Sequence, residues 1–201
     1  RRHAVSTVRE AIREEPGRVQ WPVTTGNCEG RVATFATGLY PLDEMRELMR
    51  AMRTIGMTVC IISASEQHLV EGAVRALDYP VDPAHIFGMR LTLRHGILGS
   101  ELQSEAHYPI TYRRGKQQIV EKFLSGAPVF VAGDSDTDYE MMTGFPTTEC
   151  RLLVDRGQTG LVKQLFEDPK TLLQGRDERR GGFIPAHRSL LWSDGPIMTE
   201  S

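Results

Sequence analysis

Between residues 40 and 168, strand-like apolar runs alternate with amphipathic segments, and this alternation constrains the fold more than any other feature. Apolar side chains recur every three or four residues in four segments, which predicts helices at residues 40–56, 66–80, 114–126 and 159–168. A continuous apolar run predicts a strand buried on both faces at residues 57–63, and further strands are predicted at residues 128–134 and 149–155. This order predicts an α/β fold with a mostly parallel sheet and helices on both faces.

The remaining segments are less regular. Residues 85–102 alternate around a glycine and predict a hairpin or two short strands, and residues 137–145 predict a short helix. Near the start of the chain, residues 4–12 have helical spacing, whereas residues 18–38 are rich in glycine and threonine and predict an irregular connection. Towards the end we expect a solvated loop and then a closing strand at residues 183–192. The predicted domains are a small appendage, residues 1–38, and an α/β core, residues 39–201.

Composition argues against several classes of partner. The chain has 24 Lys and Arg against 26 Asp and Glu, a formal charge of −2, so no global field indicates nucleic acid or an anionic membrane. The longest apolar run, residues 57–62, is far shorter than the roughly 20 residues of a membrane helix. Three scattered cysteines do not suit a disulfide framework or a zinc site, and Cys60 is predicted to be a buried, inert thiol. We therefore expect a reducing, cytoplasmic location.

Three carboxylates, Asp134, Asp136 and Asp138, follow the predicted strand at residues 128–134. Because like charges so close together repel, the cluster requires a positive partner. Carboxylates at a strand end without a neighbouring His or Cys favour a hard cation such as Mg²⁺, which also keeps waters and phosphate oxygens. Asp134 is the predicted direct metal ligand, and Asp138 supports it. The alternative is that Asp136 or Thr137 caps the following helix.

A second polar group follows the strand at residues 57–63. Ser63 ends this strand, and Ala64 and Ser65 lead into the next predicted helix. A hydroxyl beside free N–H groups and the positive end of a helix dipole makes a pocket for phosphate. The alternative is a capping box between Ser63 and Glu66, and the two interpretations are compatible. Because open α/β sheets bind ligands beyond the carboxyl ends of their strands, we expect Ser63 and Asp134 at the same edge.

Lys116 follows Gly115 in the first turn of the predicted helix at residues 114–126. A lysine there opposes the helix macrodipole, which makes the position unusual. The functional interpretation is a point charge that reaches a phosphate or the carboxylate cluster. The alternative is a solvated lysine beside Arg113 and Arg114.

Taken in order, these groups resemble the motifs of the haloacid dehalogenase superfamily of phosphatases. A serine that ends a strand, Gly-Lys opening a helix and Gly-Asp-x-x-x-Asp after another strand are matched at Ser63, Gly115-Lys116 and 133–138. The resemblance covers about residues 40–165. Within the superfamily, the chain most resembles the phosphoserine and phosphorylcholine phosphatases. Ala64-Ser65 is closer to the phosphorylcholine type, since the phosphoserine type usually carries Gly-Gly there.

The resemblance implies a Rossmann-like core and a Mg²⁺-dependent phosphomonoesterase that acts on a small phosphorylated metabolite through an aspartyl-phosphate. It implies catalytic roles for Ser63, Lys116 and Asp138. It implies phosphate contacts from Ser63, Ala64, Ser65 and Lys116 and a metal held by Asp134 and Asp138.

The family's first motif, D-x-D-x-T, which holds the nucleophilic aspartate, is absent from the sequence. The resemblance implies that the nucleophile strand lies upstream of Arg1 and that residues 1–38 are the C-terminal part of a helical cap. This strand is central in the family's sheet, so two neighbouring strands would be left with unpaired backbone. We therefore expect an additional N-terminal segment. A complete sheet with no gap beside the strand of Ser63 would contradict this expectation.

Two alternative functions stay open. Without a nucleophile, the chain could be a non-catalytic binding module, and a third possibility is a phosphotransferase that passes phosphate to an alcohol. Arg179, Arg180 and His187 could contact an anion, although a solvated loop is the simpler interpretation. Trp21 could line a pocket for a quaternary amine by a cation–π contact, although a core or edge tryptophan is the simpler interpretation.

Overall fold

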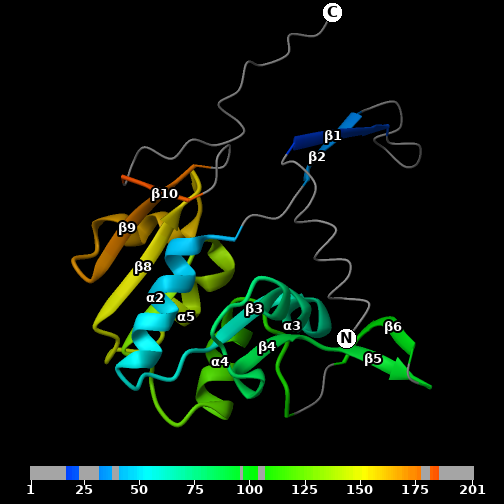
Figure 1. The fold of residues 1–201 in the computed structure, drawn as a ribbon, viewed down its shortest axis with the longest axis horizontal. Coiled ribbons are helices and arrows are strands. Elements are labelled where there is room, and N and C mark those ends of the chain that lie inside the picture. The colour runs from blue at the N-terminus through cyan, green and yellow to red at the C-terminus, as the bar shows by residue number, and fades with distance from the viewer. Residues whose placement is uncertain are drawn as a thin grey trace, which may run out of the picture.

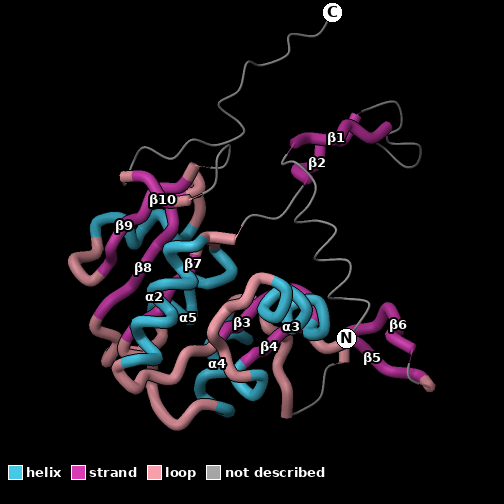
Figure 2. Tube along the Cα trace, in the orientation of Figure 1, coloured by secondary structure: helices cyan, strands magenta, loops and turns pink. Residues whose placement is uncertain are grey.

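The computed structural model describes residues 17–22, 32–37, 41–95, 97–103, 107–177 and 182–185 of the 201-residue chain. Strands alternate with helices along most of this length (Figures 1 and 2). The strands are β1 Gly17–Pro22, β2 Val32–Thr37, β3 Ile61–Glu66, β4 Ile86–Met89, β5 Leu91–Arg94, β6 Ile97–Leu102, β7 Phe130–Gly133, β8 Cys150–Asp155, β9 Thr171–Arg176 and β10 Phe183–Ile184. The α-helices are α2 Asp43–Thr54, α3 Gln67–Ala76, α4 Arg114–Phe123 and α5 Tyr139–Thr143. The 3₁₀-helices are η2 Pro83–His85, η3 Asp136–Asp138 and η4 Leu161–Glu167.

The strands form several small sheets. The largest has the order β10-β9-β8-β7, in which β7, β8 and β9 run parallel and β10 runs antiparallel to β9. β3 and β4 form a separate parallel pair. β5 with β6, and β1 with β2, form antiparallel pairs. The fold is therefore mixed α/β with parallel central strands. The described strands do not join into one continuous sheet, and β3 has one unpaired edge, as the absent D-x-D-x-T motif led us to expect for the strand of Ser63.

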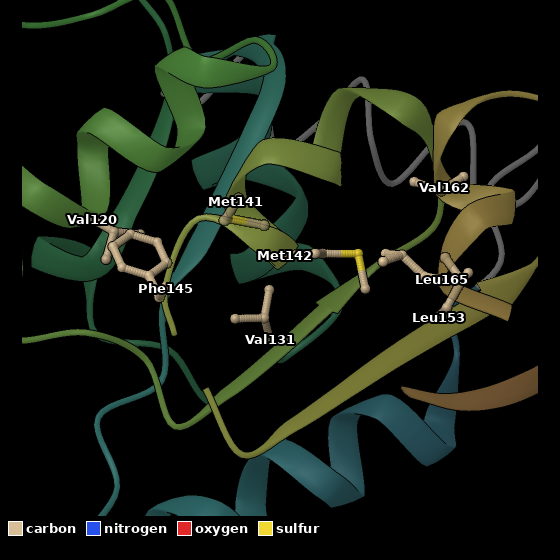
Figure 3. Packing of buried hydrophobic residues seen from close by; sticks show 8 residues of the cluster. All are labelled: Val120, Val131, Met141, Met142, Phe145, Leu153, Val162 and Leu165. Atoms are coloured by element: carbon tan, nitrogen blue, oxygen red, sulfur yellow. The ribbon is translucent and has the colours of Figure 1, made fainter. Parts of the chain in front are cut away.

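Two groups of buried side chains cover different parts of these sheets. α3 packs Val70 and Val74 against Ile86 of β4, and Met49 of α2 joins this group. The larger core cluster lies over β7 and β8 and is drawn from α4, α5 and η4 (Figure 3). Its members are Val120, Val131, Met141, Met142, Phe145, Leu153, Val162 and Leu165.

The helices begin and end close to their predicted positions. Residues 40–56 form α2, which ends before Gly56, and this glycine has the positive φ of 86° that favours glycine after a helix. The helices predicted for residues 66–80 and 114–126 are confirmed as α3 and α4. The helix predicted for residues 159–168 is η4, a 3₁₀-helix.

The strand predicted for residues 57–63 is displaced. β3 begins at Ile61 and runs to Glu66, and none of its residues is fully buried. The expectation of burial on both faces was therefore wrong, because β3 has a partner strand along one edge only among the described residues. Cys60 is accordingly half-buried, and this burial raises the pKa of its thiol to about 11, consistent with an inert thiol.

Other predictions need correction or lie outside the described residues. Residues 17–22 and 32–37 form the pair β1–β2 where an irregular connection was expected, because their β-branched and aromatic residues favour strands. β9 was not predicted at all. Of the segment 85–102, β4 pairs with β3 and only β5 and β6 form a hairpin. The helix predicted at residues 4–12 and most of the closing strand at residues 183–192 lie outside the described residues.

Candidate functional site

The polar groups predicted from the sequence gather around the start of α4. Just before this helix, Thr111 Oγ1 donates a hydrogen bond of 2.5 Å to the backbone carbonyl of Ser63 in β3. One turn into the helix, Lys116 Nζ lies 2.5 Å from Asp138 Oδ1, just beyond β7. The segment before α4 is therefore bonded to Ser63 within β3, and the first turn of α4 is bonded to the turn after β7.

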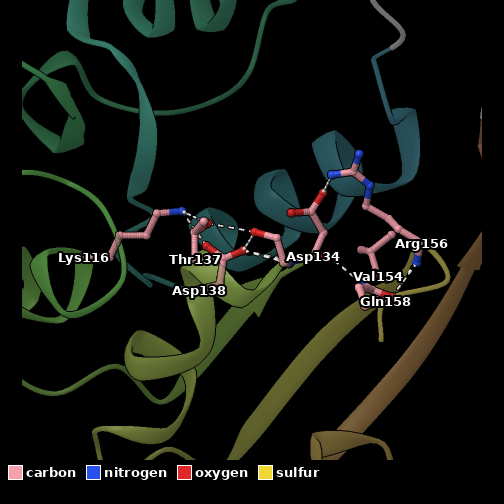
Figure 4. Close-up of polar contacts among 8 residues, drawn as sticks. Lys116, Asp134, Thr137, Asp138, Val154, Arg156 and Gln158 are labelled. Carbon is pink, nitrogen blue, oxygen red and sulfur yellow. Dashed lines mark hydrogen bonds and ion pairs between the residues drawn. The ribbon is translucent and has the colours of Figure 1, made fainter. Parts of the chain in front are cut away.

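Lys116 and Asp138 form a buried ion pair (Figure 4). Their side chains are only 6% and 7% exposed. The second oxygen of Asp138, Oδ2, accepts hydrogen bonds from the backbone N–H groups of Asp134 and Ser135 and from the Ser135 hydroxyl. Ser135 and Asp138 together form a capping box at η3. Asp138 thus uses both oxygens within the protein, and it holds the lysine and the turn after β7 in place.

Two glycines make this arrangement possible by leaving space. A Cβ atom at position 115 would lie 1.7 Å from the carbonyl oxygen of Ile110, so only glycine lets the chain fold back before Lys116. A Cβ at position 133 would lie 2.7 Å from Cβ of Asp138. The glycines of the Gly-Lys and Gly-Asp motifs are therefore required by close packing, not only by chain flexibility.

Asp134 differs from Asp138 because its carboxylate reaches solvent. Its Oδ2 lies 2.9 Å from a guanidinium nitrogen of Arg156, and the two side chains are 39% and 44% exposed. Its Oδ1 accepts no hydrogen bond from the described part of the chain. Gln158 Nε2 donates to the backbone carbonyls of Asp134 and Val154, at 2.6 and 2.7 Å, which fixes the loop after β8 against the end of β7 (Figure 4). Asp134 is thus the carboxylate of this cluster best placed to accept a cation.

The sequence interpretation missed Arg156 and Gln158. Both belong to the loop after β8, whose turn includes Gly157 at φ 68°. Their position directly beyond a predicted strand was the available signal, since loops after parallel strands form the ligand-binding edge. Their contacts with Asp134 depend on the pairing of β7 with β8, which the residue pattern does not specify.

Asp136 has a structural role at a different helix. Its Oδ1 accepts a hydrogen bond of 3.0 Å from the backbone N–H of Val162, at the start of η4. A Cβ at Gly160 would overlap its other oxygen, so the two segments are in close contact. Neither Asp136 nor Thr137 caps the following helix α5, whose N-cap residue Asp138 makes no side-chain cap hydrogen bond, and Ser135 caps the turn η3 before it.

The surroundings of Ser63 differ from the expected helix start. α3 is capped by Glu66, whose carboxylate accepts from the Leu69 N–H, so the predicted capping box between Ser63 and Glu66 is wrong. The Ser63 hydroxyl accepts a hydrogen bond from the Ser65 N–H. Positions 63–65 belong to β3, where its register against β4 is irregular. The reason is that β3 extends three residues further than predicted, which places Ala64 and Ser65 in a bulged strand, and α3 begins only at Gln67.

Glu66 also has a perturbed acidity. Burial raises the pKa of its carboxyl, but hydrogen bonds with His68 and with the Leu69 N–H outweigh this effect, and the net result is a lowered pKa. The His68 Nδ1 lies 2.7 Å from Glu66 Oε1. This pair sits at the beginning of α3, next to the bulge that carries Ser63.

The described side chains offer few ligands for a metal ion. The described residues contain no group of three or more His, Cys, Asp or Glu side chains that could hold a metal ion. Of the two predicted ligands, Asp138 uses both carboxylate oxygens in hydrogen bonds within the protein. Asp134 has one carboxylate oxygen that accepts no hydrogen bond from the described residues. Arg179, Arg180 and His187 lie outside the described residues, and nothing is described of the Trp21 side chain.

Comparison with known proteins shows a shared fold. No family model matches the chain, and no curated protein does. A solved structure of a conserved, functionally unknown protein from Anaerococcus prevotii DSM 20548 is similar with a TM-score of 0.80 and 25% identity, over 92% of this chain and 52% of that one. The chain therefore spans about half the length of that structure. A phosphoserine phosphohydrolase-like protein from Francisella tularensis subsp. tularensis SCHU S4 has a TM-score of 0.45 and 15% identity, over 56% of this chain and 50% of that one.

Proposed function

We propose that residues 1–201 belong to a Mg²⁺-dependent phosphomonoesterase that acts on a small phosphorylated metabolite. The observation that carries the proposal is the buried Lys116–Asp138 pair, in which Asp138 also fixes the backbone N–H of Asp134 just beyond β7, while the segment before α4 bonds the Ser63 carbonyl within β3. A buried lysine whose carboxylate partner also fixes the backbone of an exposed aspartate suits a phosphate bound with a divalent cation. Removing two charges from water costs desolvation free energy, and this cost favours a functional reason for the buried pair.

Each residue has a distinct part in the proposed reaction. Lys116 neutralises the charge of the bound phosphate, and Ser63 donates a hydrogen bond to a phosphate oxygen. Asp138 acts through other groups, because it orients the lysine and fixes the backbone N–H groups at positions 134 and 135. In this proposal, Ala64 and Ser65 contribute further phosphate contacts beside Ser63.

Asp134 is the residue that would hold Mg²⁺. The chain supplies part of a site, since Mg²⁺ needs only one or two carboxylates when phosphate and water provide its other ligands. When bound, the ion supplies Lewis-acid polarisation of the phosphate and screens it from an attacking carboxylate. Arg156 occupies one oxygen of Asp134 in the structure and would have to release or share it.

The attacking carboxylate belongs to polypeptide outside residues 1–201. Its oxygen forms a bond to phosphorus while the bond to the ester oxygen breaks, and the departing alkoxide takes up a proton. Water then attacks phosphorus, the aspartyl–phosphate bond breaks, and inorganic phosphate leaves. Splitting the hydrolysis into two displacements lowers each barrier.

The proposal is tested with the full-length polypeptide and a generic aryl phosphate. We expect phosphate release with Mg²⁺, its loss after chelation with EDTA, and its recovery when Mg²⁺ is added back. Binding of inorganic phosphate without any hydrolysis would instead indicate a binding module. Transfer of phosphate to an added acceptor alcohol in preference to water would indicate a phosphotransferase.

A further inference from the structure

Arg113, just before α4, has a backbone conformation that arginine rarely adopts. Its φ of 50° and ψ of −120° are those of the second residue of a type II′ turn, where glycine is preferred because it has no Cβ. The Gly115 N–H donates a hydrogen bond of 2.9 Å to the Tyr112 carbonyl, which closes this turn. Strain of this kind persists only where other contacts hold it, and it clusters at functional sites. The arginine side chain therefore has to supply something that glycine could not.

The side chain of Arg113 forms an ion pair with Glu140 of α5. The Arg113 Nε and Nη2 atoms lie 2.9 and 2.8 Å from the same oxygen, Glu140 Oε1. The two side chains are 43% and 25% exposed. The second oxygen, Glu140 Oε2, is buried and has no hydrogen-bond partner among the described residues. Because partly exposed ion pairs contribute little to stability, the stability of this pair does not explain why a strained turn carries an arginine.

Arg113 and Glu140 complete a ring of contacts around Lys116. The Lys116 N–H donates a hydrogen bond of 2.9 Å to the Arg113 carbonyl, so Arg113 anchors the backbone of the lysine. At its other end, Lys116 Nζ lies 2.5 Å from Asp138 Oδ1 (Figure 4). Asp138 ends η3, and Glu140 follows it in the first turn of α5. The ring therefore runs from the Arg113 carbonyl through Lys116 to Asp138, along the chain to Glu140, and back to the Arg113 guanidinium.

Close packing between α4 and α5 supports this ring from the other end of α5. A Cβ atom at Gly144 would lie 2.6 Å from Cδ of Gln117, the residue that follows Lys116 in α4. The same Cβ would lie 2.6 Å from the backbone carbonyl oxygen of Glu140. The two helices therefore meet at both ends of α5, through the Arg113–Glu140 pair and through this contact.

We infer that Arg113 is a positioning residue for Lys116, and that its pair with Glu140 closes the ring that keeps the lysine ammonium against Asp138. A lysine carries its charge on a flexible four-carbon stem, so a charge that acts at one place needs contacts that fix both ends of the side chain. Electrostatic stabilisation is largest when the charged group is fixed before the reaction. The effect on turnover rests on the proposed function, whereas the effect on the position of the ammonium does not.

The first test measures the accessibility of Lys116 in the full-length polypeptide by reductive methylation and peptide mass spectrometry. Lys116 should react slowly because its side chain is buried, and exposed Lys163 is the internal reference. We expect Arg113→Gly to raise the methylation rate of Lys116 at least about tenfold, because the opened ring frees the side chain. The matched control is Asp78→Gly, since Asp78 also has a positive φ, 54°, and an exposed ion pair, with Arg50. An unchanged rate in Arg113→Gly would overturn the inference.

The second test breaks the same contact from the other side. Glu140→Ala leaves Arg113 in place without its partner, and we expect the same rise in methylation of Lys116 and the same loss of turnover as in Arg113→Gly. The double variant should show no further change, because both substitutions open one ring. If Arg113 instead contacted the phosphate directly, Glu140→Ala would leave turnover unchanged or raise it. Either of these two results would overturn the inference.

Kinetics and thermal unfolding separate positioning from a purely structural role. With an aryl phosphate and Mg²⁺, Arg113→Gly should lower kcat/KM about 10- to 100-fold, mainly through kcat, because a misplaced charge weakens the transition state. Its melting temperature should stay close to that of Asp78→Gly, since glycine relieves the strained φ at both positions. A lower melting temperature with unchanged kcat and unchanged methylation of Lys116 would overturn the inference. A protein that hydrolyses no phosphate ester would refute the proposed function, and methylation would still decide whether Arg113 positions Lys116.

Discussion

At the scale of single residues, the ion pair between Lys116 and Asp138 is the most demanding feature of the molecule. Two opposite charges are nearly removed from solvent, and the carboxylate is satisfied by one ammonium, two backbone N–H groups and one hydroxyl. The pair is therefore stable as a unit but intolerant of the loss of one member. It fixes both the helix that carries the lysine and the turn that carries Asp134.

Replacement of the lysine should be strongly destabilising. Lys116→Met leaves Asp138 charged and buried, and we expect the free energy of unfolding to fall by about 3–5 kcal/mol. Urea denaturation of the full-length protein measures this loss. Lys163→Met, at an exposed position of η4, is the control and should change stability by less than about 0.5 kcal/mol. The double variant Lys116→Met with Asp138→Asn should recover part of the loss. Equal losses of stability in Lys116→Met and in the control Lys163→Met would contradict the prediction.

At the scale of secondary-structure elements, the start of α4 depends on a single close contact. The chain folds back so tightly before the helix that a Cβ at position 115 would overlap the Ile110 carbonyl. Gly115→Ala should therefore displace the first turn of α4 and destabilise the protein by about 1–3 kcal/mol. Gly126→Ala is the matched control, because a Cβ there meets no atom within 4 Å. Thermal unfolding compares the two variants, and similar melting temperatures would contradict the prediction.

The beginning of α3 should make stability depend on pH. The pKa of Glu66 is lowered in the folded protein relative to its ordinary value of 4.5, so the folded state favours the charged form. Its contribution is complete above pH 4.5 and is lost as the pH falls through the lower folded pKa. Denaturation at a series of pH values from 6 to about 3 measures this loss. Glu66→Gln should flatten that part of the profile, and an unchanged profile would show that Glu66 does not contribute.

Element by element, the sequence was most informative about the helices. α2, α3 and α4 follow from the spacing of apolar residues, and the Gly-Lys and Gly-Asp motifs follow from short runs of sequence. β9 was missed because its short run, TLLQGR, ends in polar residues and glycine and carries no clear strand pattern. The contacts of Arg156 and Gln158 with Asp134 arise only when β7 and β8 pair, so local sequence could not predict them.

At the scale of the whole molecule, β3 and β7 each keep one unpaired edge among the described residues, and this gap beside the strand of Ser63 agrees with the expectation from the absent D-x-D-x-T motif. Apolar runs indicate that strands exist, but they do not say which strands are neighbours. β3 was predicted to be buried because its sequence is apolar, and its partial exposure is explained by the missing neighbour. None of the described helices is long and apolar enough to cross a membrane. Among the described residues, the Lys116–Asp138 pair lies just beyond β7, and β3 and β7 each have one unpaired edge.

We propose that the residues around Lys116 and Asp134 hydrolyse phosphate esters with a divalent cation held by Asp134. The most direct measurement is the Mg²⁺-dependent hydrolysis of an aryl phosphate by the full-length Asp134→Asn variant, with Asp136→Asn as the matched control from the same turn. We predict that Asp134→Asn lowers the turnover rate by at least about 10²–10³ without a change in unfolding, because its carboxylate is exposed and not part of the buried network. Asp136→Asn should retain most activity, since its amide oxygen can still accept from Val162. Turnover of Asp134→Asn equal to that of the unmodified protein would contradict the account.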